Sequence, residues 1–285
     1  MSMRLVLGIL FGIAASIATV GLVGRSLWQS RSRDLCNELA ASDENVGRSV
    51  FRASQMEDLP DPVKRYFSAV LTEGQAMVAS ARIEHRGTFN MGIEASQWRR
   101  FSSVQHVVVF PPGFVWNANI QMAPGLSARV HDAYVAGRGV LTARLFGLIP
   151  VMEQPDSPEL AQGELMRFLA EAPWYPTAWL PGQAVSWEPI DASQARVTLT
   201  DGETSVSLDV RFNDEGLVDS VFSDGRYRDV NGIQVATPWE GRFWNYQDRG
   251  GMRIPMDGEV AWLLPEGRRA YWRGHIERID YRFVP

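Results

Sequence analysis

The sequence has a single cysteine, Cys36, among 285 residues. One cysteine cannot form an intramolecular disulfide bond, and it cannot supply a cysteine cluster for zinc or for an iron–sulfur centre. The four histidines are also scattered, with no two at the spacing of metal ligands: His85, His106, His131 and His275. We therefore expect no disulfide framework, no bound metal and no other cofactor.

The motifs of several enzyme classes are absent as well. The chain contains no G-x-S-x-G elbow, no phosphate-binding P-loop and no H-E-x-x-H zinc helix. Gly137-Arg138-Gly139 begins a dinucleotide-binding pattern, but Thr142 stands in place of the third glycine and no βαβ unit surrounds it. These absences favour a binding protein, and they leave open an enzyme that uses other groups.

A surplus of positive charge is also lacking. The chain carries 28 Lys and Arg against 33 Asp and Glu, a net charge of −5. Residues 1–33 contain four arginines and no acidic residue, so residues 34–285 carry −9. Nucleic-acid binding requires a clustered basic surface. We therefore exclude nucleic acid as a general partner.

A long uncharged run is present near the amino terminus, over residues 5–24. Twenty helical residues span about 30 Å, the thickness of the hydrocarbon core of a bilayer. The alternative is a cleaved signal peptide with Ala14-Ala15-Ser16 as its cleavage site, but the apolar run continues eight residues beyond that site. We expect residues 1–24 to be a transmembrane anchor that contacts membrane lipid.

The arginines around this run leave the side of the membrane undecided. Arg4 lies before the run, whereas Arg25, Arg31 and Arg33 lie after it. The positive-inside rule therefore leans only slightly towards a cytoplasmic domain. We expect a single-pass protein of the cell membrane without assigning its orientation.

Residues 25–57 are polar and weakly patterned, which indicates a juxtamembrane linker or a poorly packed helix. Residues 58–285 are expected to form a single β-rich domain that contains two helices. Apolar residues at helical spacing predict one helix at about 62–73 and a second at about 158–172. For the second helix, Ser157 is the expected N-cap and Pro158 the first helical residue.

The rest of this domain has the residue pattern of β-strands and turns. Val206, Leu208, Val210 and Phe212 alternate with polar residues, as in a strand with one wet face. Asn231-Gly232 predicts a type I′ hairpin turn. Further strands are expected near 78–89, 97–110, 114–122, 127–136, 218–229, 233–246, 252–263 and 270–283. Consecutive hairpins predict an α+β fold with a large curved antiparallel sheet, a half-barrel whose concave groove is covered by the two helices.

Several polar residues are candidates for that groove. Period two places Asp132 on the same face as Val130 and Tyr134, where a carboxylate must be paired, protonated or functional. Glu164, Arg167 and Glu171 share one face of the second helix. The ordinary interpretation of this triplet is a solvated face, and the alternative places it at the rim of the groove.

Tryptophan is concentrated in an irregular segment. Trp174, Trp179 and Trp187 fall within fourteen residues, among prolines that interrupt regular structure. Aromatic residues on a curved sheet usually fill the core, and the alternative is an aromatic cavity for an acyl chain. On that alternative the ligand-binding residues are Trp116, Asp132, Tyr134, Glu164, Arg167, Trp174, Tyr175 and Trp179.

Several segments together resemble an uncharacterised bacterial family that is known only as a domain of unknown function. They are LPDPVKRYF (59–67), PPGFVWNA (111–118), HDAYVAGRG (131–139), GELMRFLAEAPWYPTAWLP (163–181), GMRIP (251–255) and YWRGHIERIDY (271–281). Two residues depart from the pattern, with Asn117 in place of an aspartate and Phe168 in place of a tyrosine. The first departure weakens any role of that position as a catalytic acid. The resemblance implies no activity, but it implies an architecture similar to the half-barrels of periplasmic lipoprotein carriers, which hold acyl chains.

Three functions are consistent with these features. The first is a membrane-anchored protein that binds a lipid-like or other apolar ligand in the concave face of its sheet. The second is a hydrolase or isomerase with Asp132, Glu164 or His131 in the same groove, which requires a deep polar cluster and a shifted pKa. The third is a structural protein of envelope assembly, which requires a filled groove and an apolar patch elsewhere.

Overall fold

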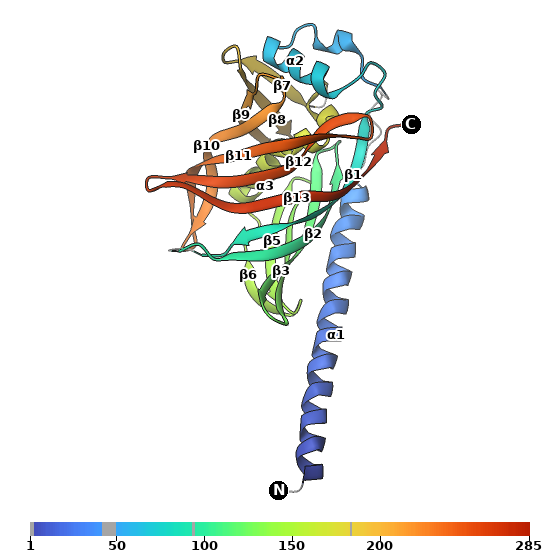
Figure 1. The fold of residues 1–285 in the computed structure, drawn as a ribbon, viewed down its shortest axis with the longest axis vertical. Coiled ribbons are helices and arrows are strands. Elements are labelled where there is room, and N and C mark those ends of the chain that lie inside the picture. The colour runs from blue at the N-terminus through green and yellow to red at the C-terminus, as the bar shows by residue number, and fades with distance from the viewer. Residues whose placement is uncertain (1–2, 42–49, 93–94, 183) are drawn as a thin grey trace.

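The computed structural model describes residues 3–41, 50–92, 95–182 and 184–285, and the side chains of residues 3–18 and of Val20 lie outside the described part. Its main feature is one antiparallel sheet of thirteen strands that curves around a helix (Figure 1). The strands are β1 (Val78–Asn90), β2 (Trp98–Val108), β3 (Gly113–Ala123), β4 (Leu126–Val135), β5 (Arg138–Leu145), β6 (Ile149–Glu153), β7 (Val185–Pro189), β8 (Gln194–Asp201), β9 (Thr204–Phe212), β10 (Val218–Val230), β11 (Ile233–Arg249), β12 (Met252–Leu264) and β13 (Gly267–Phe283).

The sheet consists of two meanders that are joined side by side. Strands β1 to β6 form one meander and β7 to β13 form the other, and β1 pairs with β13 between them, with Ile83 opposite Ile279. The predicted turn at Asn231-Gly232 is confirmed, since both residues have positive φ, 56° and 84°. This is the geometry of a type I′ turn, which matches the twist of the flanking strands. The expected α+β half-barrel is therefore present.

The helix α3 (Pro158–Ala170) connects the two edge strands of the sheet, β6 and β7, and so crosses its concave side. It contacts β4 and β5 of one meander and β9 and β10 of the other. The side chain of Ser157 accepts a hydrogen bond from the backbone N–H of Leu160, as expected for the N-cap. Two 3₁₀ turns, η2 (Ala172–Trp174) and η3 (Pro176–Trp179), follow it inside the core.

The first predicted helix of the domain is α2 (Asp61–Val70), which lies over one end of the half-barrel (Figure 1). Its Tyr66 and Phe67 are fully buried. Tyr66 contacts the rings of Trp179 and Phe212, so α2 closes the core above η3 and β9. A short 3₁₀ turn, η1 (Ala53–Met56), precedes this helix.

The longest helix, α1 (Met3–Ala41), passes along the convex face of the sheet and continues beyond it (Figure 1). The ring of Trp28 stacks on His131 with 3.8 Å between centroids, and its Nε1 donates to Asn117. Leu39 packs on Val115 in a small second core. For residues 25–57 the sequence left open a linker or a poorly packed helix, and residues 25–41 belong to α1, whose apolar side chains pack against strands far away in sequence.

Within the described part of the chain, no helix is long and apolar enough to cross a membrane. The expected span over residues 5–24 falls mostly on residues whose side chains lie outside that part. The anchor therefore stays a prediction from the sequence.

Candidate functional site

The concave face of the sheet encloses a cavity of about 700 Å³. Strands of both meanders and one side of α3 form its wall. Most of the lining is apolar or aromatic, with Phe89, Trp116, Ile120, Val130, Leu141, Trp174, Phe243, Val260, Trp262 and Trp272 among it. A mainly apolar cavity of this size is typical of small-molecule and lipid sites.

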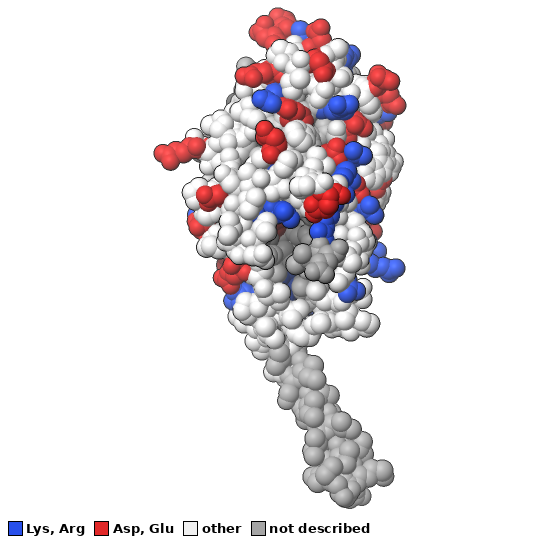
Figure 2. Space-filling view, turned by 90° about the vertical axis from the view of Figure 1, so that its left-hand side faces the viewer, with Lys and Arg blue, Asp and Glu red and all other residues white. Residues whose placement is uncertain are grey.

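The mouth of the cavity lies between hairpin tips and the edge of the sheet. Met91 comes from the β1–β2 turn, Asp229 from the β10–β11 hairpin, and Val151 and Met152 from the edge strand β6. Figure 2 shows the side of the molecule on which these tips lie, and there acidic and basic side chains are interspersed. The charge around the mouth is therefore mixed and selects no ligand of one sign.

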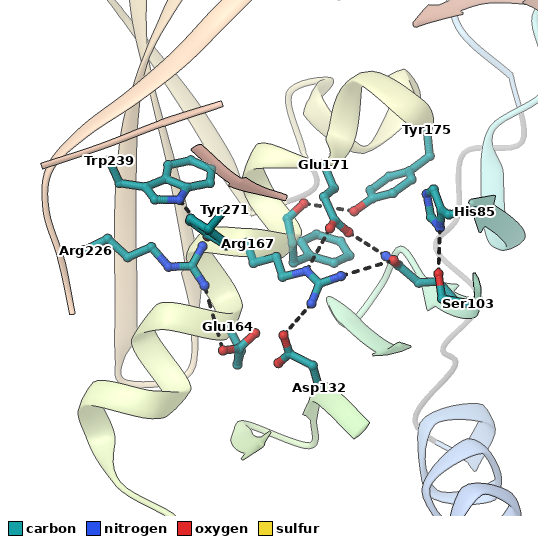
Figure 3. A network of polar contacts seen from close by, with 12 residues as sticks. His85, Ser103, Asp132, Glu164, Arg167, Glu171, Tyr175, Arg226, Trp239 and Tyr271 are labelled. Carbon is teal, nitrogen blue, oxygen red and sulfur yellow. Dashed lines mark hydrogen bonds and ion pairs between the residues drawn. The ribbon is translucent and has the colours of Figure 1, made fainter. Parts of the chain in front are cut away.

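Arg167 of α3 is the centre of a buried polar cluster on the cavity wall (Figure 3). Its guanidinium contacts Asp132 at 2.5 Å and Glu171 at 2.8 Å, and it lies over the rings of Phe114 and Trp116. Burial alone lowers the pKa of Arg167, but the surrounding carboxylates outweigh burial and raise it. Arg167 is therefore a fixed positive charge held by carboxylates from α3 and β4.

Glu164, one helical turn before Arg167, is almost completely buried, with 4% of its surface exposed. Burial raises the pKa of Glu164, the negative charge of Asp132 raises it further, and Arg226 opposes both effects from 3.8 Å. Within the described residues, Oε2 of Glu164 and Oδ1 of Asp132 have no hydrogen-bond partner. The negative charge of Asp132 and burial both favour the protonated form of Glu164, which is the direction of its pKa shift.

The opposite wall is formed by Arg226 of β10 and its aromatic neighbours (Figure 3). The guanidinium lies 5.2 Å from the ring centroid of Trp239, whose Nε1 donates to the hydroxyl of Tyr271 at 2.9 Å. The cluster thus combines two arginines with the carboxyl groups of Asp132, Glu164 and Glu171. It makes one end of the cavity polar, with charges of both signs.

Five of the eight predicted ligand-binding residues line the cavity: Trp116, Asp132, Glu164, Arg167 and Trp174. The other three are core residues whose polar atoms are used inside the fold. The hydroxyl of Tyr134 donates to Asp201, that of Tyr175 to the carbonyl of Phe168, and the indole of Trp179 to the carbonyl of Leu169. Whether any of the eight contacts a ligand stays a prediction.

The interpretation of Glu164, Arg167 and Glu171 as a solvated helix face was wrong. All three side chains are 15% exposed or less, because α3 is enclosed by both arms of the sheet. Sequence reasoning missed Arg226, Trp239 and Tyr271, which come from the second meander. Their strands were predicted, but nothing local indicates that these strands face α3.

Other polar groups of the core do not form a site. Ser103 and His85 approach at 3.5 Å, but neither lines the cavity. Burial, with the positive charges of Arg167 and His275, lowers the pKa of His85 to about 3 and keeps it neutral. The described residues hold no group of His, Cys, Asp and Glu that could bind a metal ion.

Comparison with known proteins places the chain in a family. A model of the family of unknown function DUF6920 matches residues 57–281, which confirms the resemblance seen in the motifs. No curated protein matches the chain.

The solved structures that are similar to this chain have 10–12% sequence identity with it. A putative outer membrane lipoprotein-sorting protein domain from Vibrio parahaemolyticus is 10% identical with a TM-score of 0.38, over 78% of this chain and 91% of that one. A LolA superfamily protein from Nitrosomonas europaea is 12% identical with a TM-score of 0.37, over 79% and 93%. A β-barrel-like protein of a domain of unknown function, DUF1849, from Brucella abortus is 11% identical with a TM-score of 0.22, over 72% and 99%.

Proposed function

The chain belongs to DUF6920, a family without an assigned activity, and we propose that it binds a lipid-like, largely apolar ligand in the cavity between α3 and the concave face of the sheet. The observation that carries this proposal is the cavity itself, about 700 Å³ of space walled by aromatic and aliphatic side chains. Burial of apolar ligand surface there contributes about 25 cal/mol per Å².

The lining supports an amphiphile better than a wholly apolar compound. Aromatic and aliphatic side chains surround most of the space, and one end carries the polar cluster of Asp132, Glu164, Arg167 and Arg226. An acyl chain fits the first region and a polar head fits the second. A protein of envelope assembly would instead require a groove filled by its own side chains, and this groove is open.

Gly163 offers a direct test of this proposal. It lies on the cavity side of α3, and a Cβ built there meets nothing within 4 Å. Gly163→Phe therefore fills the cavity, and it replaces glycine inside a helix, which favours folding. The probe is a diazirine-bearing monoacylglycerol that is photolysed with the full chain in nanodiscs. We expect it to label cavity peptides of the wild type about tenfold more than those of Gly163→Phe, which corresponds to a loss of about 1.4 kcal/mol of binding free energy.

The matched control is Gln162→Phe, which adds the same ring one residue away, at a position outside the lining. This variant should be labelled like the wild type. Equal labelling of the Gly163→Phe cavity, or adducts confined to α1, would show that the cavity does not hold the ligand. Mass spectrometry of the digested protein separates these outcomes.

The carboxyl pair favours a second candidate function, acid–base catalysis on the bound ligand by a hydrolase or isomerase. Burial and the charge of Asp132 raise the pKa of Glu164 on the wall of a mainly apolar cavity, which is the kind of shift that general acid–base catalysis uses. With a panel of acylglycerol esters, Glu164→Gln should lower turnover by about 10²-fold or more while labelling persists. Glu159→Gln, at a half-buried lining position on the same helix, is the control. Absence of turnover by the wild type would leave binding as the function.

We also propose that the uncharged run over residues 5–24 anchors the chain in the cell membrane as a single span. The support is its length of twenty residues and its place in α1, which continues beyond the β-rich domain (Figure 1). Carbonate extraction of membranes tests the anchor, because an integral protein stays in the pellet.

A further inference from the structure

Exposed apolar side chains are concentrated in one region of the surface. Of the twelve large apolar side chains that are exposed in the described part of the chain, seven come from two short segments. They are Leu22, Val23 and Leu27 of α1, and Phe146, Ile149, Val151 and Met152 of the β5–β6 hairpin. We call these seven residues the apolar rim.

The two segments of the apolar rim are in backbone contact. A Cβ built on Gly24 would lie 2.2 Å from the carbonyl oxygen of Phe146, and one built on Gly147 would lie 2.6 Å from the carbonyl oxygen of Gly24. Only glycine allows an approach this close. The two segments of the apolar rim therefore meet at the place where α1 leaves the domain.

The tip of the hairpin has an unusual backbone. Phe146 has φ of 54° and Gly147 has φ of 75°, and Leu148 N–H donates to the carbonyl of Leu145 at 3.0 Å, as in a type I′ turn. Asn, Asp and Gly are the usual residues there, and a bulky residue is strained. The Phe146 ring is 42% exposed, so packing inside the fold does not explain why an aromatic residue occupies this position.

Two arginines beside the apolar rim, Arg25 of α1 and Arg129 of β4, have no ion pair or hydrogen bond within the described residues. They lie near each other, because Trp28, three residues after Arg25, stacks on His131, two residues after Arg129. After burial, the charge of Arg25 is the second cause that lowers the pKa of Arg129. Two unpaired cations this close together favour an anion between or beside them.

We infer that the apolar rim rests on the surface of a lipid bilayer, with Arg25 and Arg129 on the phosphates of its headgroups. The uncharged run over residues 5–24 ends within the rim, so one helix carries both the apolar run and the contact surface. Arginine beside apolar side chains is typical of the bilayer interface. A second copy of the chain would also cover the seven side chains, but it would leave unexplained why the apolar run ends within the rim.

The test places a fluorophore on the apolar rim of the full chain in vesicles. In a Cys36→Ala background, Ile149→Cys is labelled with an environment-sensitive dye, and Ile190→Cys, exposed in the β7–β8 turn, is the matched control. In vesicles of phosphatidylcholine and phosphatidylglycerol with brominated acyl chains, the dye at residue 149 should be quenched and the dye at residue 190 should not. Absence of quenching at both positions would overturn the inference. Self-quenching of the dye at residue 149 when the protein is highly diluted in lipid would also overturn it, because it indicates a second copy.

The arginines provide a second readout. Replacing Arg25 and Arg129 together by Gln should abolish the stronger quenching that phosphatidylglycerol gives over phosphatidylcholine alone. The control replaces Arg31 and Arg33, which are exposed further along α1, and should keep that difference. Persistence of the difference without Arg25 and Arg129 would refute their contact with phosphate. These results do not depend on whether the cavity binds a ligand.

Discussion

At the scale of single residues, the chemistry of the site was only partly visible in the sequence. Alternation along β4 was enough to place Asp132 on the inner face. It could not reveal that Arg167 contacts this carboxylate or that Arg226 pairs with Glu164, because these groups come from α3 and from a strand almost a hundred residues away. Helical spacing showed that Glu164 and Arg167 share a face, and burial of that face depends on the two arms of the sheet.

His131, the neutral histidine under α1, gives a prediction for how stability depends on pH. Burial, with the charge of Arg31, lowers the pKa of His131 to about 4, against about 6.5 when unfolded. Between these values the unfolded chain binds a proton that the folded chain does not, so His131 lowers stability as the pH falls, by up to about 1.4 kcal/mol per pH unit. Glu164, whose pKa is raised, has the opposite effect. In urea titrations in detergent, His131→Gln should therefore lose stability less steeply than the wild type from pH 6.5 to 4. Parallel slopes would show that His131 is protonated in the fold.

At the scale of elements, long half-buried strands were predictable and edge strands were not. The strands of both long runs, β1 to β4 and β10 to β13, were expected near their observed bounds. The strands β5, β6, β7 and β8 were missed. In β6, residues 149–153 are exposed at every position and so have no alternation to detect. The same exposure is what makes the β5–β6 hairpin part of the apolar rim.

The docking of α1 on this hairpin can be tested with two glycines of one helix. Alanine is about 1 kcal/mol better than glycine inside a helix. Gly21→Ala should therefore keep or raise the free energy of unfolding, since nothing lies within 4 Å of its Cβ. Gly24→Ala should lower it, because the new Cβ meets the carbonyl of Phe146. Urea titrations of the two variants compare them directly, and equal stability would mean that α1 does not hold the hairpin in solution.

At the scale of the whole molecule, the cavity and the apolar rim share residues. Val151 and Met152 line the cavity and are also exposed on the edge strand β6. If the rim contacts a bilayer, the mouth of the cavity opens beside the lipid. A lipid can then enter from the membrane without crossing water. Contact with the bilayer would also explain why the apolar edge strand β6 is left uncovered by the rest of the fold.

Val151→Asp tests this route, because a carboxylate at the mouth is costly to bring to the bilayer surface. In proteoliposomes, labelling of the cavity by a long-chain diazirine lipid in the bilayer should fall about tenfold, as for a loss of about 1.4 kcal/mol. Labelling by a water-soluble short-chain analogue added from solution should stay unchanged, because the interior of the cavity is intact. Ile190→Asp introduces the same charge at an exposed residue of the β7–β8 turn and should affect neither probe. An equal loss for both lipids would place the defect in the cavity, and no loss for either would mean that the ligand enters elsewhere.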